Sequence, residues 1–361
     1  MKKFYLLVIT CFFIVMLPLC SFIWHKSPTK AKVSSHFKEG KTEFSTNKNK
    51  NTRAMDTYLR QIHFNGVVLV SKNEENIFKK GYGYRNVTSQ LPNTPNTYYP
   101  VASISKFFVA TSLMQLNEKG LISFNDPISK YIPNFPNGSK LTLFHLISHT
   151  SGIKMQKELF NTISSTNLIK EIIKSNSQYK PLNKWDYNDA NYMLLAYVIE
   201  KVTGKSYGES VKTNIFDKAK ITEIGQGNDF YKKENHAIGY KLIQTNSEPK
   251  QLRLPNFSYL LGCGDIYSTV TGIQKMDEAL LSHKLISNKS FVQFIKPYQH
   301  HYAFGIYNKG GYVYNHGVFR GIDCINVFDP ISKTIVIVFS NSQKMKPITL
   351  DVAMKLFKLV K

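Results

Sequence analysis

The stretch from residue 98 to residue 116 constrains the fold of this chain more than any other, because it is apolar on every side. After Lys106 almost every residue in it is apolar or small, so a helix here has no polar face and must run through the middle of a domain. That places Ser103 at the start of a buried helix. A serine three residues before a lysine on a helix has its Oγ on the same face as the lysine Nζ, within reach of it.

The Ser103–Lys106 pair is therefore a candidate nucleophile and its activating amine. A lysine that is removed from water can lose its proton and activate a neighbouring hydroxyl. The Ser-x-x-Lys pattern itself recurs elsewhere in this chain, but only this copy opens a long apolar helix. On this stretch alone, a helix-capping serine beside an unrelated lysine remains an open alternative.

The N-terminus predicts attachment to a membrane. Two lysines precede an apolar run from Phe4 to about Trp24, which at roughly 20 residues is long enough to span a bilayer. No small-x-small cleavage site follows it, so residues 1–25 are interpreted as a transmembrane signal anchor with the rest of the chain outside the cytoplasm. A cleaved signal peptide and lipoprotein processing at Cys20 are the alternatives. Residues 26–52 contain little to bury and predict a flexible polar tether.

The charge of the chain points to an anionic partner. The formal net charge is +23, of which the first 52 residues contribute +7 through nine lysines and two glutamates, leaving +16 on the remainder. Such a field concentrates polyanions near the surface. For an anchored chain outside the cytoplasm, membrane or wall polymers are the expected partners, and nucleic acid is not. Composition bias toward lysine is the alternative explanation.

Cysteine and histidine usage predicts neither a disulfide framework nor a metal site. Two of the four cysteines lie in the apolar N-terminal run, and only Cys263 and Cys324 remain, so at most one bridge is open. No Cys-x-x-Cys pair is present. We interpret Cys263 as an inert apolar residue and His145 and His149 as structural, and we expect no cofactor.

Apolar patterns predict strands near both ends of the domain and helices between them. Strands are predicted at residues 66–71, 77–84, 302–307, 312–314, 323–328 and 334–340, and helices at 271–282 and 347–359. Residues 126–266 are typical of short helices and loops. This order favours an α/β sandwich, with an antiparallel sheet flanked by helices and a helical lobe inserted into it.

Four segments in order resemble the serine β-lactamase/penicillin-binding-protein superfamily, in its class C-like branch. They are residues 101–106, 141–152, 187–192 running into 202–207, and 262–269. The resemblance covers roughly residues 64–345. It implies a β-lactamase/transpeptidase-like sandwich and makes residues 53–361 a catalytic domain.

The resemblance also implies roles for particular residues. Ser103 is the nucleophile, Lys106 its amine partner, and Tyr187 stands where the family's Tyr-x-Asn tyrosine acts as base or shares the proton with the lysine. Taken alone, Tyr187 could equally be a core residue. The oxyanion hole is formed by the backbone N–H groups of Ser103 and of the residue after the third motif.

Two departures from the family pattern bear on substrate choice. Asp189 replaces the asparagine of the second motif. The third motif, normally Lys-Thr-Gly or His-x-Gly, is best aligned as Asn315-His316-Gly317, which makes Val318 the second oxyanion donor. A shifted alignment with His316 first is the alternative. The chain thereby loses the cation that helps to bind a substrate carboxylate, and gains an anion beside the scissile bond.

Both departures resemble the FmtA-type group of wall proteins, which is associated with removing D-alanine esters from teichoic acids. The predicted function is therefore a membrane-anchored cell-wall serine esterase acting on teichoic acid through a Ser103 acyl-enzyme. A D-alanyl-D-alanine carboxypeptidase, a β-lactamase-type penicillin-binding protein and a catalytically silent wall-binding scaffold are the alternatives. β-Lactams are expected to acylate the serine slowly.

Overall fold

The computed structural model describes residues 50–155, 161–177, 179, 183–241, 250–343 and 345–360. The predicted anchor and the predicted tether as far as residue 49 lie outside the described residues. Helix α1 (Lys50–Gln61) begins three residues before the predicted start of the domain at residue 53, so the predicted flexible tether is wrong for residues 50–52, which are helical. In the part of the chain that is described, no helix is both long and apolar enough to cross a membrane.

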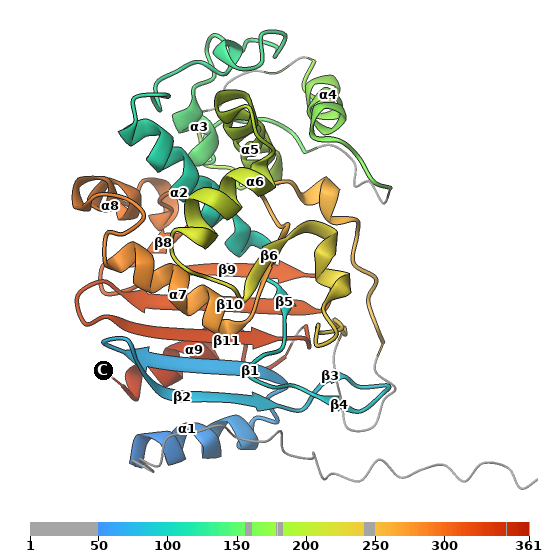
Figure 1. Ribbon diagram of the computed structural model, residues 1–361, viewed down its shortest axis with the longest axis vertical. Helices are drawn as coiled ribbons and strands as arrows, with labels where there is room; N and C mark the ends of the chain where they lie inside the picture. Colours follow the sequence, from blue (N-terminus) through green and yellow to red (C-terminus); the bar gives the residue numbers. More distant parts are fainter. Residues whose placement is uncertain are drawn as a thin grey trace, which may run out of the picture. The chain divides into compact units, whose positions relative to one another are not determined.

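A six-stranded antiparallel sheet joins the two ends of the domain (Figure 1). Its strands, in spatial order, are β2 (Glu75–Tyr82), β1 (Gly66–Lys72), β11 (Thr334–Ser340), β10 (Ile322–Asp329), β9 (Val313–Phe319) and β8 (Tyr307–Asn308). Strand β1 pairs with β11 from Gly66 opposite Ser340 to Lys72 opposite Thr334. Runs of β-branched residues form these central strands because they pack well on a pleated surface buried on both faces.

The predicted strand at residues 302–307 is wrong over most of its length. Only Tyr307 belongs to a strand, and Tyr302 forms an isolated bridge with it. Gly305 between them has a φ of +73° and lies against α2, where a Cβ would come 2.7 Å from the Lys106 carbonyl oxygen. The chain must turn here to make room for that helix, so the apolar sequence forms a turn.

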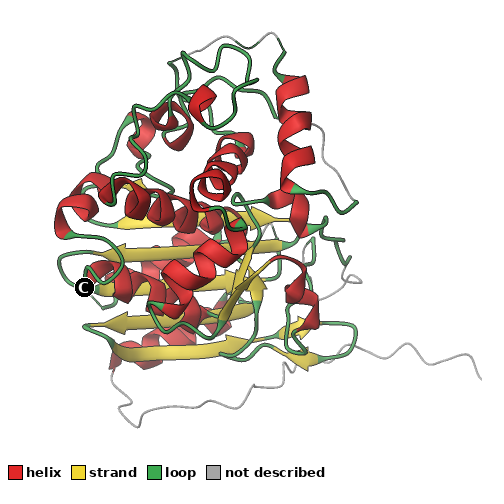
Figure 2. Cartoon of the chain, turned by 45° about the horizontal axis from the view of Figure 1, so that its top comes forward, coloured by secondary structure: helices red, strands yellow, loops and turns green. Residues whose placement is uncertain are grey.

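Helices cover both faces of the sheet (Figure 2). Apolar side chains of α1 and of α9 (Thr349–Lys358) pack on one face. The larger core on the other face includes α2 (Ser105–Glu118), α7 (Val270–Leu281) and α8 (Asn288–Ile295). The predicted α/β sandwich is confirmed.

The predicted buried helix is confirmed in α2. Every residue from Ser105 to Leu116 is buried. Phe107 packs against Phe294 of α8 and Phe328 of β10, with ring centroids 5.7 and 6.3 Å apart. A helix with no solvent-facing side therefore connects the sheet to the rest of the core.

The inserted lobe between the sheet's strands contains mostly helices, as predicted. Its α-helices are α3 (Leu143–Ile147), α4 (Ser165–Ser175), α5 (Asp189–Thr203) and α6 (Tyr207–Val211), followed by a π-helix at Lys212–Asp217. The sequence analysis missed a small sheet of β5 (Tyr99–Pro100), β7 (Ile266–Ser268) and β6 (Ile224–Gln226), and a hairpin of β3 (Tyr84–Asn86) and β4 (Leu91–Pro92). Strands of two or three residues are too short to show an alternating pattern.

The burial of Phe107 predicts a large stability loss on truncation. We expect Phe107→Ala to lower the free energy of unfolding by about 3–5 kcal/mol, because neighbouring rings cannot fully close the cavity it leaves. Urea unfolding measures this. The control is Val292→Ala on α8, whose side chain is exposed. A loss below about 1 kcal/mol for Phe107→Ala would contradict the tight packing of α2.

Candidate active site

Ser103 lies on a single turn of 3-10 helix, Ala102–Ile104, directly before α2. The turn is held on one side by the Val101 N–H, which donates to the Ile266 carbonyl of β7 at 3.0 Å. Ala102 has a φ of +49°, a conformation that non-glycine residues rarely adopt and that is concentrated at functional sites. This strained residue turns the chain so that Ser103 faces a cavity at the N-terminal end of α2.

Lys106 is buried beside Ser103 and uses all three of its N–H groups. Its side chain is 1% exposed. Nζ donates to Ser103 Oγ at 3.0 Å, to Asp189 Oδ1 at 2.6 Å and to the Cys263 carbonyl oxygen at 3.1 Å. An ammonium group has three donors and no acceptor, so these three partners satisfy its charged form completely.

Electrostatics keep Lys106 protonated in the resting site. Burial alone would lower the pKa of Lys106, but the charge of Asp189 and the hydrogen bond to it outweigh burial and raise that pKa above its ordinary value. The sequence indicated only the desolvation, which favours a neutral amine. The Asp189 carboxylate instead raises the pKa of Lys106 and favours the charged amine. Lys106 therefore cannot accept the serine proton until it has given up one of its own.

Tyr187 forms the opposite wall of the site, two residues before Asp189 begins α5. Desolvation raises the pKa of Tyr187, while its interactions with Lys106 and Ser103 oppose that rise. The Lys106 Nζ lies 4.9 Å from the centre of the tyrosine ring. The predicted second-motif residues therefore converge on the serine and lysine.

His149 supports the Tyr187 ring from behind. The two ring centroids are 4.4 Å apart. His149 Nδ1 accepts from the Asn188 N–H and from Asn191 Nδ2, which assigns the proton to Nε2, 3.2 Å from the Tyr302 hydroxyl. Burial, then the charge of Lys106, lower the pKa of His149 well below its ordinary value, so the imidazole is neutral. The predicted structural role of this histidine is confirmed.

His145 is also structural, as predicted. Its ring Nδ1 accepts from the Thr142 N–H at 3.1 Å and completes a capping box at the start of α3. The cap places the segment that leads to His149.

The third motif lies on β9, just beyond the two residues of this strand that pair with the edge strand β8. A Cβ on Gly317 would lie 2.0 Å from the Val101 carbonyl oxygen and 3.0 Å from the Ser103 nitrogen. Only glycine permits this approach, which favours the predicted alignment of the motif. Val318 follows with an exposed side chain. The oxyanion hole formed by the N–H groups of Ser103 and Val318 stays a prediction.

Asn315 and His316 have different surroundings on β9. Asn315 is 2% exposed, and neither its amide nitrogen nor its amide oxygen has a hydrogen-bond partner among the described residues. His316 Nε2 lies 2.7 Å from Asp323 Oδ1 on β10. Leaving a buried amide unpaired costs about 1–3 kcal/mol, so Asn315 is suited to bind a group that enters the cavity.

These residues surround a cavity of about 420 Å³, called here the Ser103 cavity. All of the predicted site residues except Gly317 line it. The sequence analysis missed five further lining residues: Tyr302, Gly305, Tyr307, Tyr314 and Leu350. The concentration of tyrosines between residues 302 and 314 was the available signal for three of them. No cluster of three or more His, Cys, Asp or Glu suited to a metal occurs within the described ranges.

The turn that contains Cys263 supplies the third Lys106 acceptor. Both Cys263 and Cys324 are free and buried, and burial raises the pKa of the Cys263 thiol well above its ordinary value, in keeping with the predicted inert role. Asp265 ties this turn to β6 by accepting from Gln226 Nε2 at 2.7 Å. Burial raises the pKa of Asp265 to about 7. The sequence analysis missed this positioning residue.

Comparison with known proteins gives consistent matches over most of the chain. A model of the family described as Beta-lactamase matches residues 51–357. The chain is 38% identical over 290 residues to the putative penicillin-binding protein PbpX of Bacillus subtilis (strain 168). The matched region covers 80% of this chain and 73% of that relative. It is 34% identical over 273 residues to the teichoic acid D-alanine hydrolase of Staphylococcus aureus (strain MRSA252). That match covers 74% of this chain and 68% of the hydrolase.

A solved structure shows the same similarity in three dimensions. The crystal structure of FmtA from Staphylococcus aureus superposes with a TM-score of 0.81 at 29% sequence identity, covering 90% of this chain and 94% of that one. These matches confirm the resemblance predicted from the sequence motifs.

The ion pair predicts how Lys106 responds to loss of its carboxylate. We expect Asp189→Asn to lower the pKa of Lys106, because burial, which favours the neutral amine, is then no longer outweighed. An NMR titration of the Lys106 Nζ measures this directly. The control is Asp186→Asn, which removes the same charge from an exposed neighbour. An unchanged Lys106 titration in Asp189→Asn would contradict the assigned cause.

Proposed function

The chain belongs to the Beta-lactamase family, and from that premise we propose that it is a cell-wall serine esterase that removes D-alanine esters from teichoic acids. The coarser statement, a serine hydrolase of the β-lactamase/penicillin-binding-protein superfamily, follows from its relatives. The observation that carries the finer proposal is the carboxylate of Asp189, which touches Lys106 and also lines the Ser103 cavity. In this proposal the predicted anchor, residues 1–25, holds the domain at the outer face of the membrane.

The first step forms the acyl-enzyme's new bond. Ser103 Oγ attacks the ester carbonyl carbon, and the serine proton passes to Lys106 as Lys106 transfers one of its own protons to the Tyr187 hydroxyl, whose proton moves onto the ester oxygen. The carbonyl electron pair moves onto the carbonyl oxygen, where the two predicted oxyanion donors stabilise it. Because Lys106 begins protonated, it relays the serine proton and keeps its own charge beside Asp189.

The second step breaks the ester bond. The intermediate collapses, and the polyol oxygen leaves with the bonding electrons and with the proton that it received from Tyr187. Water then attacks the D-alanyl-Ser103 carbonyl and passes its proton along the same path. Cleavage of the bond to Oγ returns that proton to Ser103 and releases D-alanine.

The charges of the cavity suit this substrate. A D-alanyl ester has an ammonium group next to the carbonyl and no carboxylate beyond the ester oxygen. Asp189 is 38% exposed while bound to Lys106, so it can also face an ammonium group. Asn315 replaces the cation that would bind a carboxylate, and His316 is paired with Asp323. A carboxypeptidase or β-lactamase substrate, which has a free carboxylate next to the scissile amide, fits this site less well.

The serine esterase proposal predicts loss of activity on removal of the nucleophile. We expect Ser103→Ala to abolish hydrolysis of a chromogenic D-alanyl ester and to abolish labelling by a fluorophosphonate, measured by intact-protein mass spectrometry. Ser89→Ala, at an exposed position, is the control and keeps both. Equal rates for Ser103→Ala and the wild type would end the proposal.

Two further results distinguish the alternative functions. Absence of any covalent adduct, with salt-dependent binding of teichoic acid retained, would favour the non-catalytic scaffold. Rapid turnover of nitrocefin would favour a β-lactamase, whereas the esterase predicts slow acylation and negligible turnover.

Recognition of the substrate ammonium predicts a selective effect of Asp189→Asn. We expect kcat/KM for a D-alanyl ester to fall about ten- to a hundredfold, since a charge-assisted contact is worth roughly 1.5–3 kcal/mol. For a neutral acetyl ester we expect kcat/KM to stay nearly unchanged in the same variant. The amide that replaces the Asp189 carboxylate still accepts from Lys106, and the lowered pKa of Lys106 lets it accept the serine proton itself.

Asp186→Asn is the matched control here as well and changes neither rate. Equal losses on both esters in Asp189→Asn would show that Asp189 acts only through Lys106. The ammonium-recognition argument would then be wrong, while the esterase activity itself would stand.

A further inference from the structure

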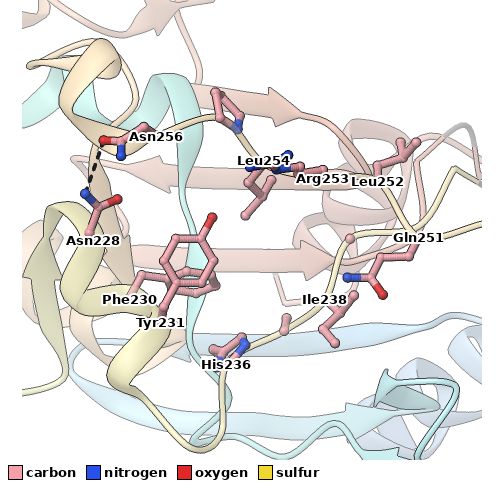
Figure 3. Close-up of a pocket in the computed structure, with 13 residues that line it drawn as sticks. Asn228, Phe230, Tyr231, His236, Ile238, Gln251, Leu252, Arg253, Leu254 and Asn256 are labelled. Carbon is pink, nitrogen blue, oxygen red and sulfur yellow. Dashed lines mark hydrogen bonds between the residues drawn. The ribbon is translucent and has the colours of Figure 1, made fainter. Parts of the chain in front are cut away.

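A second cavity of about 660 Å³ lies outside the catalytic machinery (Figure 3). Its walls come from three segments: the 3-10 helix Gly227–Lys232, residues 236–239 and residues 251–256. None of the residues of the Ser103 cavity lines it. We call it the Tyr231 cavity.

An exposed aromatic ring projects into this cavity from a rigid support. Tyr231 is 48% exposed, and Figure 3 shows its ring directed into the cavity. The neighbouring rings of Phe230 and Phe257 contact it edge-on at centroid distances of 5.3 and 5.8 Å. A ring held in this way loses little conformational freedom when a ligand stacks on it, and its apolar face is suited to the C–H face of a sugar.

Polar groups surround the ring. Arg253 lines the same cavity as Tyr231, and its guanidinium opposes the rise that burial causes in the pKa of Tyr231. Arg253 is exposed, and none of the carboxylates of the described residues forms an ion pair with it. Gln251 points into the cavity from the side opposite Tyr231. At the rim, Asn228 Nδ2 donates to Asn256 Oδ1 at 3.1 Å.

This set of groups fits a sugar bound next to a phosphate. A guanidinium matches the geometry of phosphate oxygens, an amide can donate to and accept from sugar hydroxyls, and an aromatic ring packs against the sugar's apolar face. The +16 charge beyond the first 52 residues favours an anionic ligand. A purely apolar ligand would make no polar contact with Arg253 or Gln251, which are both exposed residues of the cavity wall.

One hairpin, formed by β9 and β10, contacts the wall of the Tyr231 cavity and also contributes to the wall of the Ser103 cavity. Gly239, in the wall of the Tyr231 cavity, lies against the turn between β9 and β10, where a Cβ would be 2.5 Å from the Arg320 carbonyl oxygen. Strand β9, which leads into this turn, carries Val318 in the wall of the Ser103 cavity. Val318 lies two residues before the turn at Arg320 and Gly321, whose backbone atoms contact Gly239. A polymer chain can therefore reach both cavities.

We propose that the Tyr231 cavity binds a glycosylated polyol-phosphate segment of the same polymer whose ester is cleaved at Ser103. The sugar stacks on Tyr231, and the adjacent phosphate pairs with Arg253. This inference rests on the proposed function for the identity of the polymer. Binding at a second point keeps the polymer on the enzyme between successive esters.

Binding to polymer without ester groups tests the proposal separately from catalysis. The probe is purified glycosylated teichoic acid from which D-alanine has been removed by mild base, titrated into the full chain by calorimetry. We expect Tyr231→Ala and Arg253→Gln each to weaken binding about tenfold, with kcat/KM for a small D-alanyl ester unchanged. Tyr231→Phe, which keeps the ring, and Arg53→Gln on α1, which removes the same charge elsewhere, should bind as the wild type does.

Three outcomes would contradict the proposal or part of it, and a fourth would separate it from the proposed catalytic activity. Unchanged binding in Tyr231→Ala and Arg253→Gln, with both variants folded by thermal melts, would exclude the cavity as the site. Equal affinity for a sugar-free polyol phosphate would exclude the sugar contact. Tighter binding of a peptidoglycan fragment would assign the cavity to a different polymer. Loss of polymer binding only in these variants, in a chain that shows no esterase activity, would support the cavity and reject the catalytic proposal.

Discussion

The buried ion pair between Lys106 and Asp189 is the interaction on which the catalytic site depends. A lysine charge that is 1% exposed is tolerated only when each of its protons has an acceptor, because an unpaired buried charge is very costly. The acceptors come from the turn before α2, the start of α5 and the turn at Cys263. Three separate parts of the chain must therefore meet at one nitrogen atom.

Close backbone approaches make this convergence geometrically feasible. Gly317 lets β9 lie against the strained turn at Ala102, and Gly305 lets the chain fold back over the start of α2. A side chain at Gly317 would push β9 away from the Ser103 turn, and a side chain at Gly305 would push its loop away from the start of α2. The fully apolar character of α2 serves the same end, since a helix packed on all sides cannot shift to accommodate a displaced neighbour. The reactive groups are thus held on rigid elements.

The β9–β10 hairpin relates the proposed chemistry to the proposed polymer binding. Its strand contributes Asn315, His316 and Val318 to the Ser103 cavity, and its turn supports the wall of the Tyr231 cavity. An enzyme acting on a repeating polymer benefits from contacts on both sides of the bond it cleaves, because binding energy away from that bond positions the reacting group. In that proposal, the net positive charge of the chain supplies attraction at longer range and little selectivity.

The sequence by itself determined the elements whose signals are local. The apolar run after Lys106, the β-branched runs of β1 and β11, and the ordered motifs were sufficient to predict the buried helix, the sandwich and the residues gathered around Ser103. Tertiary structure alone decided the turn at Gly305, the Tyr231 cavity and the charge of Lys106. The lysine's protonation depends on a carboxylate 83 positions away along the chain and 2.6 Å away in space, and electrostatic energy follows distance in space. No local pattern contains that distance.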